Sequence, residues 1–177
     1  MAVSKDQKEY KITSQFAICT KEVLLKSNNL YLAKFLPDFK RFGYLDHIVS
    51  EANNVMLNLI SIYDEKNEKE FLDVAKGFSN WLYKCPDDLL DYYIKEINHL
   101  QIIKRYRIFK KPEKEKLLKI IEKEESPMQY KVAAYALLGN QEEAEYFFKK
   151  LSKEQKDLFA NQPIERFLEF RHSELKK

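Results

Sequence analysis

The stretch YLDHIVSEANNVMLNLISIY, residues 44–63, decides the fold class. Its apolar residues recur every three or four positions, which is the period of a helix that buries one face. The recurring positions are Leu45, Ile48, Val49, Ala52, Met56, Leu59 and Ile60. Nowhere in the chain do alternating β-branched residues flank an Asn-Gly or Asp-Gly turn. We therefore expect a long amphipathic helix here and little or no strand anywhere.

The same spacing continues on both sides of this stretch. Before it, a helix is expected after Ser4 and a short one over 30–36; after it, a helix over 67–83 ends before Pro86. Pro86 and the two acids that follow favour a new helix start, with the helix running toward Arg107. A charged helix follows over residues 113–124. With only 3 Gly and 5 Pro in 177 residues, the prediction is an all-α, irregular array of about seven or eight helices.

The last third of the chain carries explicit helix-end signals. Residues 126–129, Ser-Pro-Met-Gln, match a capping box, and the helix they open is expected to end at Gly139 in the left-handed conformation. Asn140 and two glutamates then open the next helix. Ser152 and Gln155 repeat the capping-box spacing, so a further helix is expected there.

The predicted core consists of large apolar residues on these three-and-four stripes. They are Leu45, Ile48, Met56, Leu59, Phe71, Phe78, Trp81, Leu90, Ile94 and Ile97. Because each would be removed from water in the folded state, truncation of one to alanine is expected to cost about 2–5 kcal/mol.

The charge and cysteine content exclude several classes of protein. The chain has 31 Lys and Arg against 28 Asp and Glu, a net charge of +3, with both signs interspersed. Its pI of about 8.6 lies below that of dedicated nucleic-acid-binding domains, and only five residues are arginine. There is no CxxC pair, no apolar secretory segment at the start and no apolar run long enough to span a membrane. We expect a cytoplasmic protein, and the Lys, Asn and Ile bias suggests a bacterial or phage origin.

Residues 134–151, AYALLGNQEEAEYFFKKL, resemble a single helical hairpin of the tetratricopeptide repeat family. Ala134, Gly139, Ala144 and Phe148 stand at the offsets of that family's small, turn and aromatic positions. Small side chains are needed where two antiparallel helices approach to about 8–10 Å. Met128 and Val132 depart from the pattern, and no second copy follows at the repeat period. The resemblance implies a repeat-like carboxy-terminal hairpin that binds a protein or peptide.

The charged segment between Lys110 and Glu125, flanked by prolines, is the candidate domain boundary. We expect a helical bundle over 1–110 and a repeat-like extension over 111–177, which could also form one continuous domain. The predicted function is a non-enzymatic protein-interaction module, such as an immunity factor, adaptor or regulator. Another protein is the expected partner, and nucleic acid is a less favoured one.

Arginine is followed by histidine six residues later at Arg41 and His47, and again at Arg166 and His172. This spacing is similar to the arginine-histidine motif of the HEPN family, small helical ribonucleases and toxins that work without metal. In that alternative, arginine would stabilise charge on the phosphate and histidine would act as general acid or base. Phe42 and Phe167 stand where the family has a polar residue.

No cofactor or metal site is predicted. The three histidines are scattered, and the sequence contains no phosphate-binding glycine motif and no zinc-protease or serine-hydrolase signature. Aromatic and basic residues interleave over 104–111 in the way a single-strand nucleic-acid platform would. A solvated helix end that covers core aromatic rings is the preferred interpretation of that segment.

Overall fold

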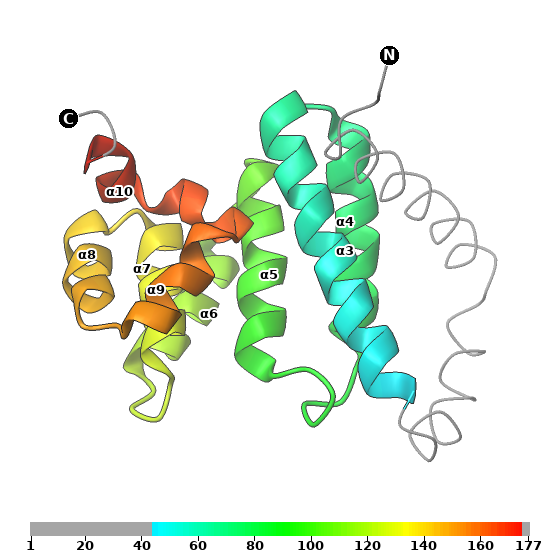
Figure 1. Cartoon of the computed structure of the whole chain (residues 1–177), viewed down its shortest axis with the longest axis horizontal. Coiled ribbons are helices and arrows are strands. Elements are labelled where there is room, and N and C mark those ends of the chain that lie inside the picture. Colours follow the sequence, from blue (N-terminus) through cyan, green and yellow to red (C-terminus); the bar gives the residue numbers. More distant parts are fainter. Residues whose placement is uncertain (1–43, 175–177) are drawn as a thin grey trace. The chain divides into compact units, whose positions relative to one another are not determined.

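The computed structural model describes residues 44–174, and side chains over 49–172. This part of the chain forms eight α-helices and one 3₁₀ helix, with no strand, so the all-α prediction is confirmed (Figure 1). The chain divides into two compact units, Met1–Leu90 and Asp91–Lys177. The predicted domain boundary at 110/111 stays a prediction, since these units describe packing alone. Helices expected after Ser4 and over 30–36 lie outside the described residues.

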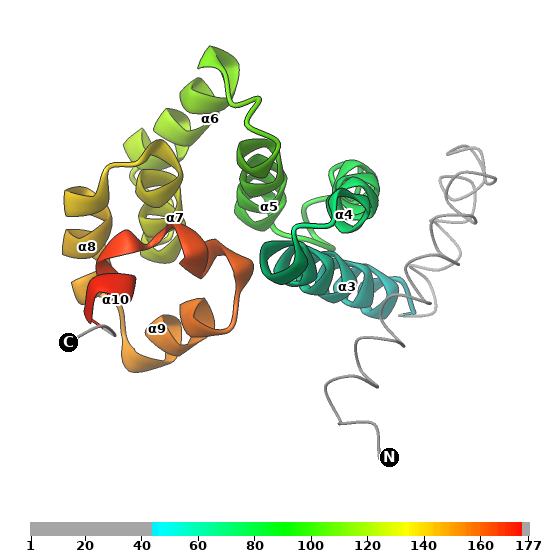
Figure 2. The same cartoon turned by 90° about the horizontal axis from the view of Figure 1, so that it is seen from above.

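The first unit contains a pair of helices, α3 (Tyr44–Lys66) and α4 (Lys69–Leu82), which lie side by side (Figures 1 and 2). Between them Asn67 has φ 57° and donates its N–H to the Tyr63 carbonyl at 2.8 Å. Asparagine tolerates this left-handed conformation better than most residues, so it can end α3 sharply. The buried faces of the two helices consist of Val49, Ala52, Met56, Leu59, Ile60, Leu72, Val74, Ala75, Phe78 and Leu82.

The second unit begins with α5 (Tyr92–Arg105), and its start differs from the prediction. The carboxylate of Asp91 accepts hydrogen bonds from the backbone N–H groups of Tyr93 at 2.7 Å and Ile94 at 3.3 Å. The preceding residues instead turn back on Pro86, whose carbonyl accepts from the N–H of Leu90 at 3.3 Å. The expected helix start at Pro86 is therefore wrong, because a side-chain cap at Asp91 outcompetes proline and the acids after it.

The remaining elements are α6 (Lys111–Glu122), α7 (Met128–Leu138), α8 (Gln141–Lys149), α9 (Lys153–Ala160), η1 (Pro163–Phe167) and α10 (Glu169–Glu174). Helix α7 is the centre of this unit, because α5, α6, α8 and η1 all pack against it (Figure 2). Its sequence is apolar on most sides as a result. Its buried residues are Val132, Ala133, Ala134, Ala136 and Leu137.

Each unit has its own buried apolar residues, and the predicted core divides between them. Of the predicted residues, Met56, Leu59, Phe78 and Ile97 are buried. Half-buried ones are Phe71, Trp81, Leu90 and Ile94, whereas the side chains of Leu45 and Ile48 lie outside the described set. Ile97 joins the core of the second unit, together with Leu100, Leu117, Ile120, Leu137, Ala144, Leu151, Phe159, Ile164 and Leu168.

The two predicted capping boxes have opposite outcomes. At Ser152 the box forms: its hydroxyl accepts from the Gln155 N–H at 3.3 Å, and its own N–H donates to Gln155 Oε1 at 3.0 Å. At Ser126 it does not, because the helix starts after Pro127 and the Ser126 hydroxyl is buried with no partner among the described residues. Gln129, the other half of that expected box, accepts instead from Gln155 Nε2 at 3.2 Å.

Candidate protein-interaction surface

The hairpin of α7 and α8 is built as its sequence predicted. Gly139 ends α7 with φ 84°, and the next N–H, that of Asn140, donates to the Tyr135 carbonyl at 3.0 Å. The Asn140 side chain then caps α8 by accepting from the Glu143 N–H at 3.3 Å. Ala144 is fully buried in the core that includes α7. The left-handed glycine and the buried alanine are thus both confirmed.

One side of this hairpin carries three contacting aromatic rings and a lysine, which we name the aromatic face: Tyr135, Tyr146, Phe147 and Lys150. The rings of Tyr135 and Phe147 stack with centroids 5.5 Å apart, which joins α7 to α8. Tyr146 meets Phe147 edge-on at 5.3 Å. Although Tyr146 belongs to this cluster, 54% of it remains exposed to solvent.

Lys150 covers part of the aromatic face. Its ammonium nitrogen lies 3.8 Å from the centroid of the Tyr146 ring and 5.5 Å from that of Phe147. A cation held over an aromatic ring is attracted by its negative π face. The lysine caps the carboxy-terminal end of α8 four residues after the tyrosine, so the last turn of the helix brings the two side chains together.

Electrostatics differ along α8. Its first turn carries Glu142 and Glu143, and its last turn Lys149, which complements the helix dipole at both ends. Burial, and then the nearby charge of Glu143, raises the pKa of Tyr135 above its ordinary value. As for any tyrosine at neutral pH, its phenol is protonated and offers a hydrogen-bond donor.

Another side of α8 is occupied by residues 159–170. Phe148 packs edge-on against Phe159 at 5.8 Å and Phe170 at 5.5 Å. Gln141 holds the backbone of this segment: its Nε2 donates to the Phe167 carbonyl and its Oε1 accepts from the Glu169 N–H, both at 3.0 Å. The aromatic face is therefore the side of α8 that this segment leaves open.

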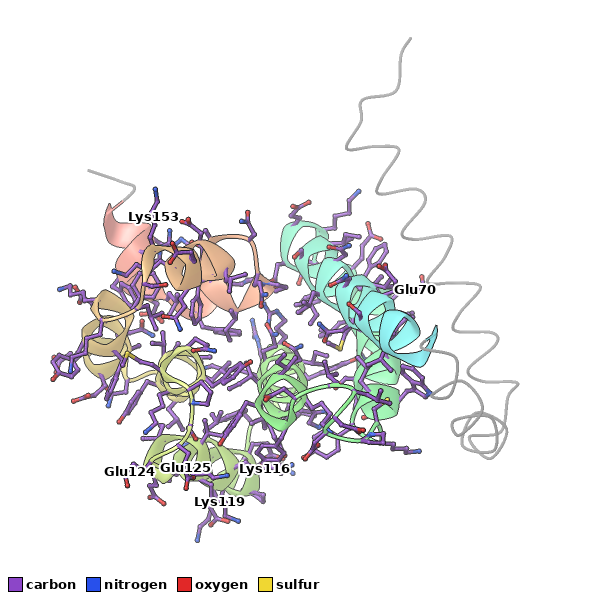
Figure 3. The ribbon with its side chains drawn as sticks, turned by 60° about the horizontal axis from the view of Figure 1, so that its bottom comes forward. Glu70, Lys116, Lys119, Glu124, Glu125 and Lys153 are labelled. Atoms are coloured by element: carbon purple, nitrogen blue, oxygen red, sulfur yellow. The ribbon has the colours of Figure 1, made fainter. Side chains whose placement is uncertain are left out.

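A second aromatic group lies where α5 begins. Tyr93 stacks on Tyr130 at 5.3 Å and meets Tyr92 edge-on at 5.4 Å, and Lys123 lies 5.8 Å over its ring. Among them Tyr92 is 40% exposed. Figure 3 shows Lys116 and Lys119 projecting from nearby α6. Lys116 pairs with the buried carboxylate of Glu96 at 3.4 Å. A lysine of this surface is therefore paired with a carboxylate of the protein itself, which, among the described residues, is not the case for the lysine of the aromatic face.

Two of the basic residues over 104–111, Lys104 and Arg105, make contacts within the protein, whereas Arg107, Lys110 and Lys111 are exposed. Lys104 donates to the Leu137 carbonyl at the end of α7, and its ammonium lies 5.1 Å from the Phe167 ring. Arg105 is buried, donates to the Pro163 carbonyl at 2.7 Å and lies 4.8 Å over that same ring. These contacts hold η1 in place, so Arg105 is part of the interior and not of a solvated helix end.

The residues of the ribonuclease alternative are only partly described. Arg166 and His172 are exposed and stand on different short elements, η1 and α10. His47 lies in α3, but its side chain is outside the described set, as is Arg41 altogether. The arginine-histidine motif therefore stays a prediction.

Neither a metal centre nor a membrane span is found in the part of the chain that the structure describes. No group of three His, Cys, Asp or Glu side chains there could hold a metal ion. No described helix combines the length and the apolar character that crossing a bilayer requires. Comparisons with protein families, with curated proteins and with solved structures found no match to this chain.

Proposed function

We propose that this chain is a non-enzymatic, helical protein-interaction module and that the aromatic face is its docking surface. The observation that carries the proposal is Tyr146, which is 54% exposed while its ring touches both Phe147 and Lys150. Tyrosine contributes large contact area with few rotatable bonds, so an ordered, exposed tyrosine loses little entropy when a partner covers it.

Rigidity of the scaffold supports this proposal. Gly139 and the Asn140 cap fix the turn between the two helices, and the Tyr135–Phe147 stack ties their outer sides together. A binding site on well-held helices keeps its geometry before the partner arrives, which lowers the cost of binding. Adaptor, immunity and regulatory proteins act through such surfaces without chemistry of their own, and we propose a role of that kind in the cytoplasm.

Other exposed apolar residues make a matched control. Leu158 on α9 is 62% exposed and belongs to no described aromatic cluster. Single exposed apolar side chains are normal on protein surfaces, whereas grouped ones mark interaction sites. A substitution at Leu158 therefore removes an exposed apolar side chain that is not part of the aromatic face.

The experiment is affinity capture from host lysate with the full chain and with the Tyr146→Ser and Leu158→Ser variants, each first shown to be folded. A partner recovered by the wild type and by Leu158→Ser, but lost with Tyr146→Ser, is the expected result. Equal recovery by all three variants would contradict the proposed surface. Cleavage of RNA by the purified chain, abolished by His172→Ala, would contradict the non-enzymatic function.

A further inference from the structure

The two lysines at the end of α8 have different surroundings. Lys149 pairs with the Glu145 carboxylate one turn earlier, at 2.7 Å. Lys150 lies over the Tyr146 ring, and no carboxylate among the described residues forms an ion pair with it. Its ammonium has three donors, and a ring face is a weaker partner than a carboxylate. The structure thus presents an ordered cation beside the exposed tyrosine.

Local charge around Lys150 is mostly positive. Lys153 follows on the first turn of α9 and is exposed, and Figure 3 shows it projecting outward from that helix. The nearest following acid, Glu154, accepts from the Ser152 hydroxyl at 2.8 Å. Its backbone hydrogen bond, and then that hydroxyl, hold the pKa of Glu154 below the ordinary value, so Glu154 stays negatively charged while its carboxylate is held at the α9 cap. Complementarity across an interface therefore calls for negative charge on the partner here.

We infer that the partner is a protein segment that places an apolar side chain on Tyr146 and an aspartate or glutamate against Lys150. This inference rests on the proposed function of the aromatic face. A carboxylate would form a charge-assisted hydrogen bond with an ammonium that the Tyr146 ring already holds in place. The apolar side chain would cover the remaining exposed ring and exclude water from that bond.

Nucleic acid fits this surface less well. Recognition of phosphates depends on several cations along a track or on the bidentate fork of arginine. The aromatic face has no arginine. The rings of Tyr135 and Phe147 stack on each other with centroids 5.5 Å apart, so the ring faces in that contact are not available to stack on a base. An acidic, apolar protein segment is the occupant that the arrangement favours.

The test uses a random-peptide display library selected on the immobilised full chain, with binders to the Tyr146→Ser variant removed. Surviving peptides should carry Asp or Glu close to a Leu, Ile, Phe or Trp. For one such synthetic peptide, Lys150→Gln should weaken binding about tenfold or more, as should amidation of the peptide's acid, because a hydrogen bond between charged groups is lost. Combining both changes should weaken binding no further. Lys149→Gln is the matched control and should leave the affinity unchanged.

The outcomes separate the two proposals. Two results would overturn the inferred partner chemistry while the proposed docking surface still holds. One is that the peptides bind through Tyr146 but contain no Asp or Glu; the other is that Lys150→Gln leaves the affinity of an acidic peptide unchanged. A library that yields no Tyr146-dependent peptide overturns both, and so does a short single-stranded RNA that binds the wild type and not Tyr146→Ser.

Discussion

Gly139 and Arg107 both adopt a left-handed backbone conformation at the end of a helix, with φ of 84° and 58°. Glycine accepts this conformation freely, whereas a side chain makes it costlier by about 1–2 kcal/mol. Space around Gly139 is open, since an added β-carbon would meet no atom within 4 Å. Backbone strain should therefore decide the effect of substitutions at Gly139.

At Gly139, replacement by valine should lower the free energy of unfolding by about 1–2 kcal/mol, because a β-branched residue is poorly suited to positive φ. Gly139→Asn should cost less, since asparagine visits this region more readily. Chemical denaturation of the two variants measures the difference. Equal losses would show that the turn is not limited by backbone strain.

At Arg107 the expected change in the free energy of unfolding has the opposite sign. Arg107→Gly should raise the free energy of unfolding by up to about 1 kcal/mol, because relief of left-handed strain exceeds the extra entropy of glycine in the unfolded chain. Urea titration beside the wild type checks this. A loss of stability would mean that the arginine side chain holds the end of α5 through contacts of its own.

The helix ends show which of the predicted capping boxes form in the folded protein. The Ser152 box forms as predicted, because both of its partners lie within one turn and are exposed. The Ser126 box fails because α7 starts one residue later, with Pro127 at its N-cap, and Gln129 bonds Gln155, a residue 26 positions later. Local patterns predicted the existence of the helices over 44–174 well, but a start that depends on a contact from a distant helix could not be read from them.

Two serine substitutions should therefore have different effects. Ser152→Ala should destabilise the protein by about 1 kcal/mol, the usual cost of losing a side-chain cap. Ser126→Ala should be neutral or stabilising, because it removes a buried hydroxyl that has no partner among the described residues. Thermal unfolding of both variants gives the comparison. A larger loss at Ser126 would point to a bonded water or a partner for that hydroxyl.

At the scale of the whole molecule, the second unit should fold by itself. Its core takes Ile97 and Leu100 from α5, and Arg105 bonds Pro163 near the other end of the unit. A fragment of residues 91–177 should therefore unfold cooperatively, whereas a fragment of 111–177, cut at the predicted boundary, should lose most of that cooperativity. Circular dichroism during heating distinguishes them. Equal cooperativity would show that α5 is dispensable and favour the 110/111 boundary.

Alkaline pH tests the half-buried phenols of this unit, Tyr130 and Tyr135. Burial, and then the charge of Asp91, raises the pKa of Tyr130 above 10.0, and burial followed by Glu143 does the same for Tyr135. A pKa raised on folding means that the folded state holds its protons longer, so this stability is complete below about pH 10 and is lost as the pH rises further. Tyr130→Phe should make that loss shallower in denaturation measured from pH 9 to 12. If the free energy of unfolding of Tyr130→Phe depends on pH as that of the wild type does, Tyr130 is excluded as a source of the loss.

The candidate site was predictable only in part. Spacing within residues 134–151 predicted a hairpin with Gly139 at its turn and Ala144 buried, and both are confirmed. Which side of α8 stays open was not predictable, because that depends on Gln141 bonding the backbone at Phe167 and Glu169, far along the chain. The four-residue spacing of Tyr146 and Lys150 was the available signal, but it is common on solvated helices.

The most direct test of the docking surface is photo-crosslinking of the captured partner from a photoreactive aromatic residue introduced at Tyr146, compared with the same residue introduced at Leu158. The two sites are similarly exposed, so each reports contact without a large change in surface. The account predicts a strong crosslink from position 146 and none from position 158. A partner that crosslinks from position 158 and not from position 146 would contradict it.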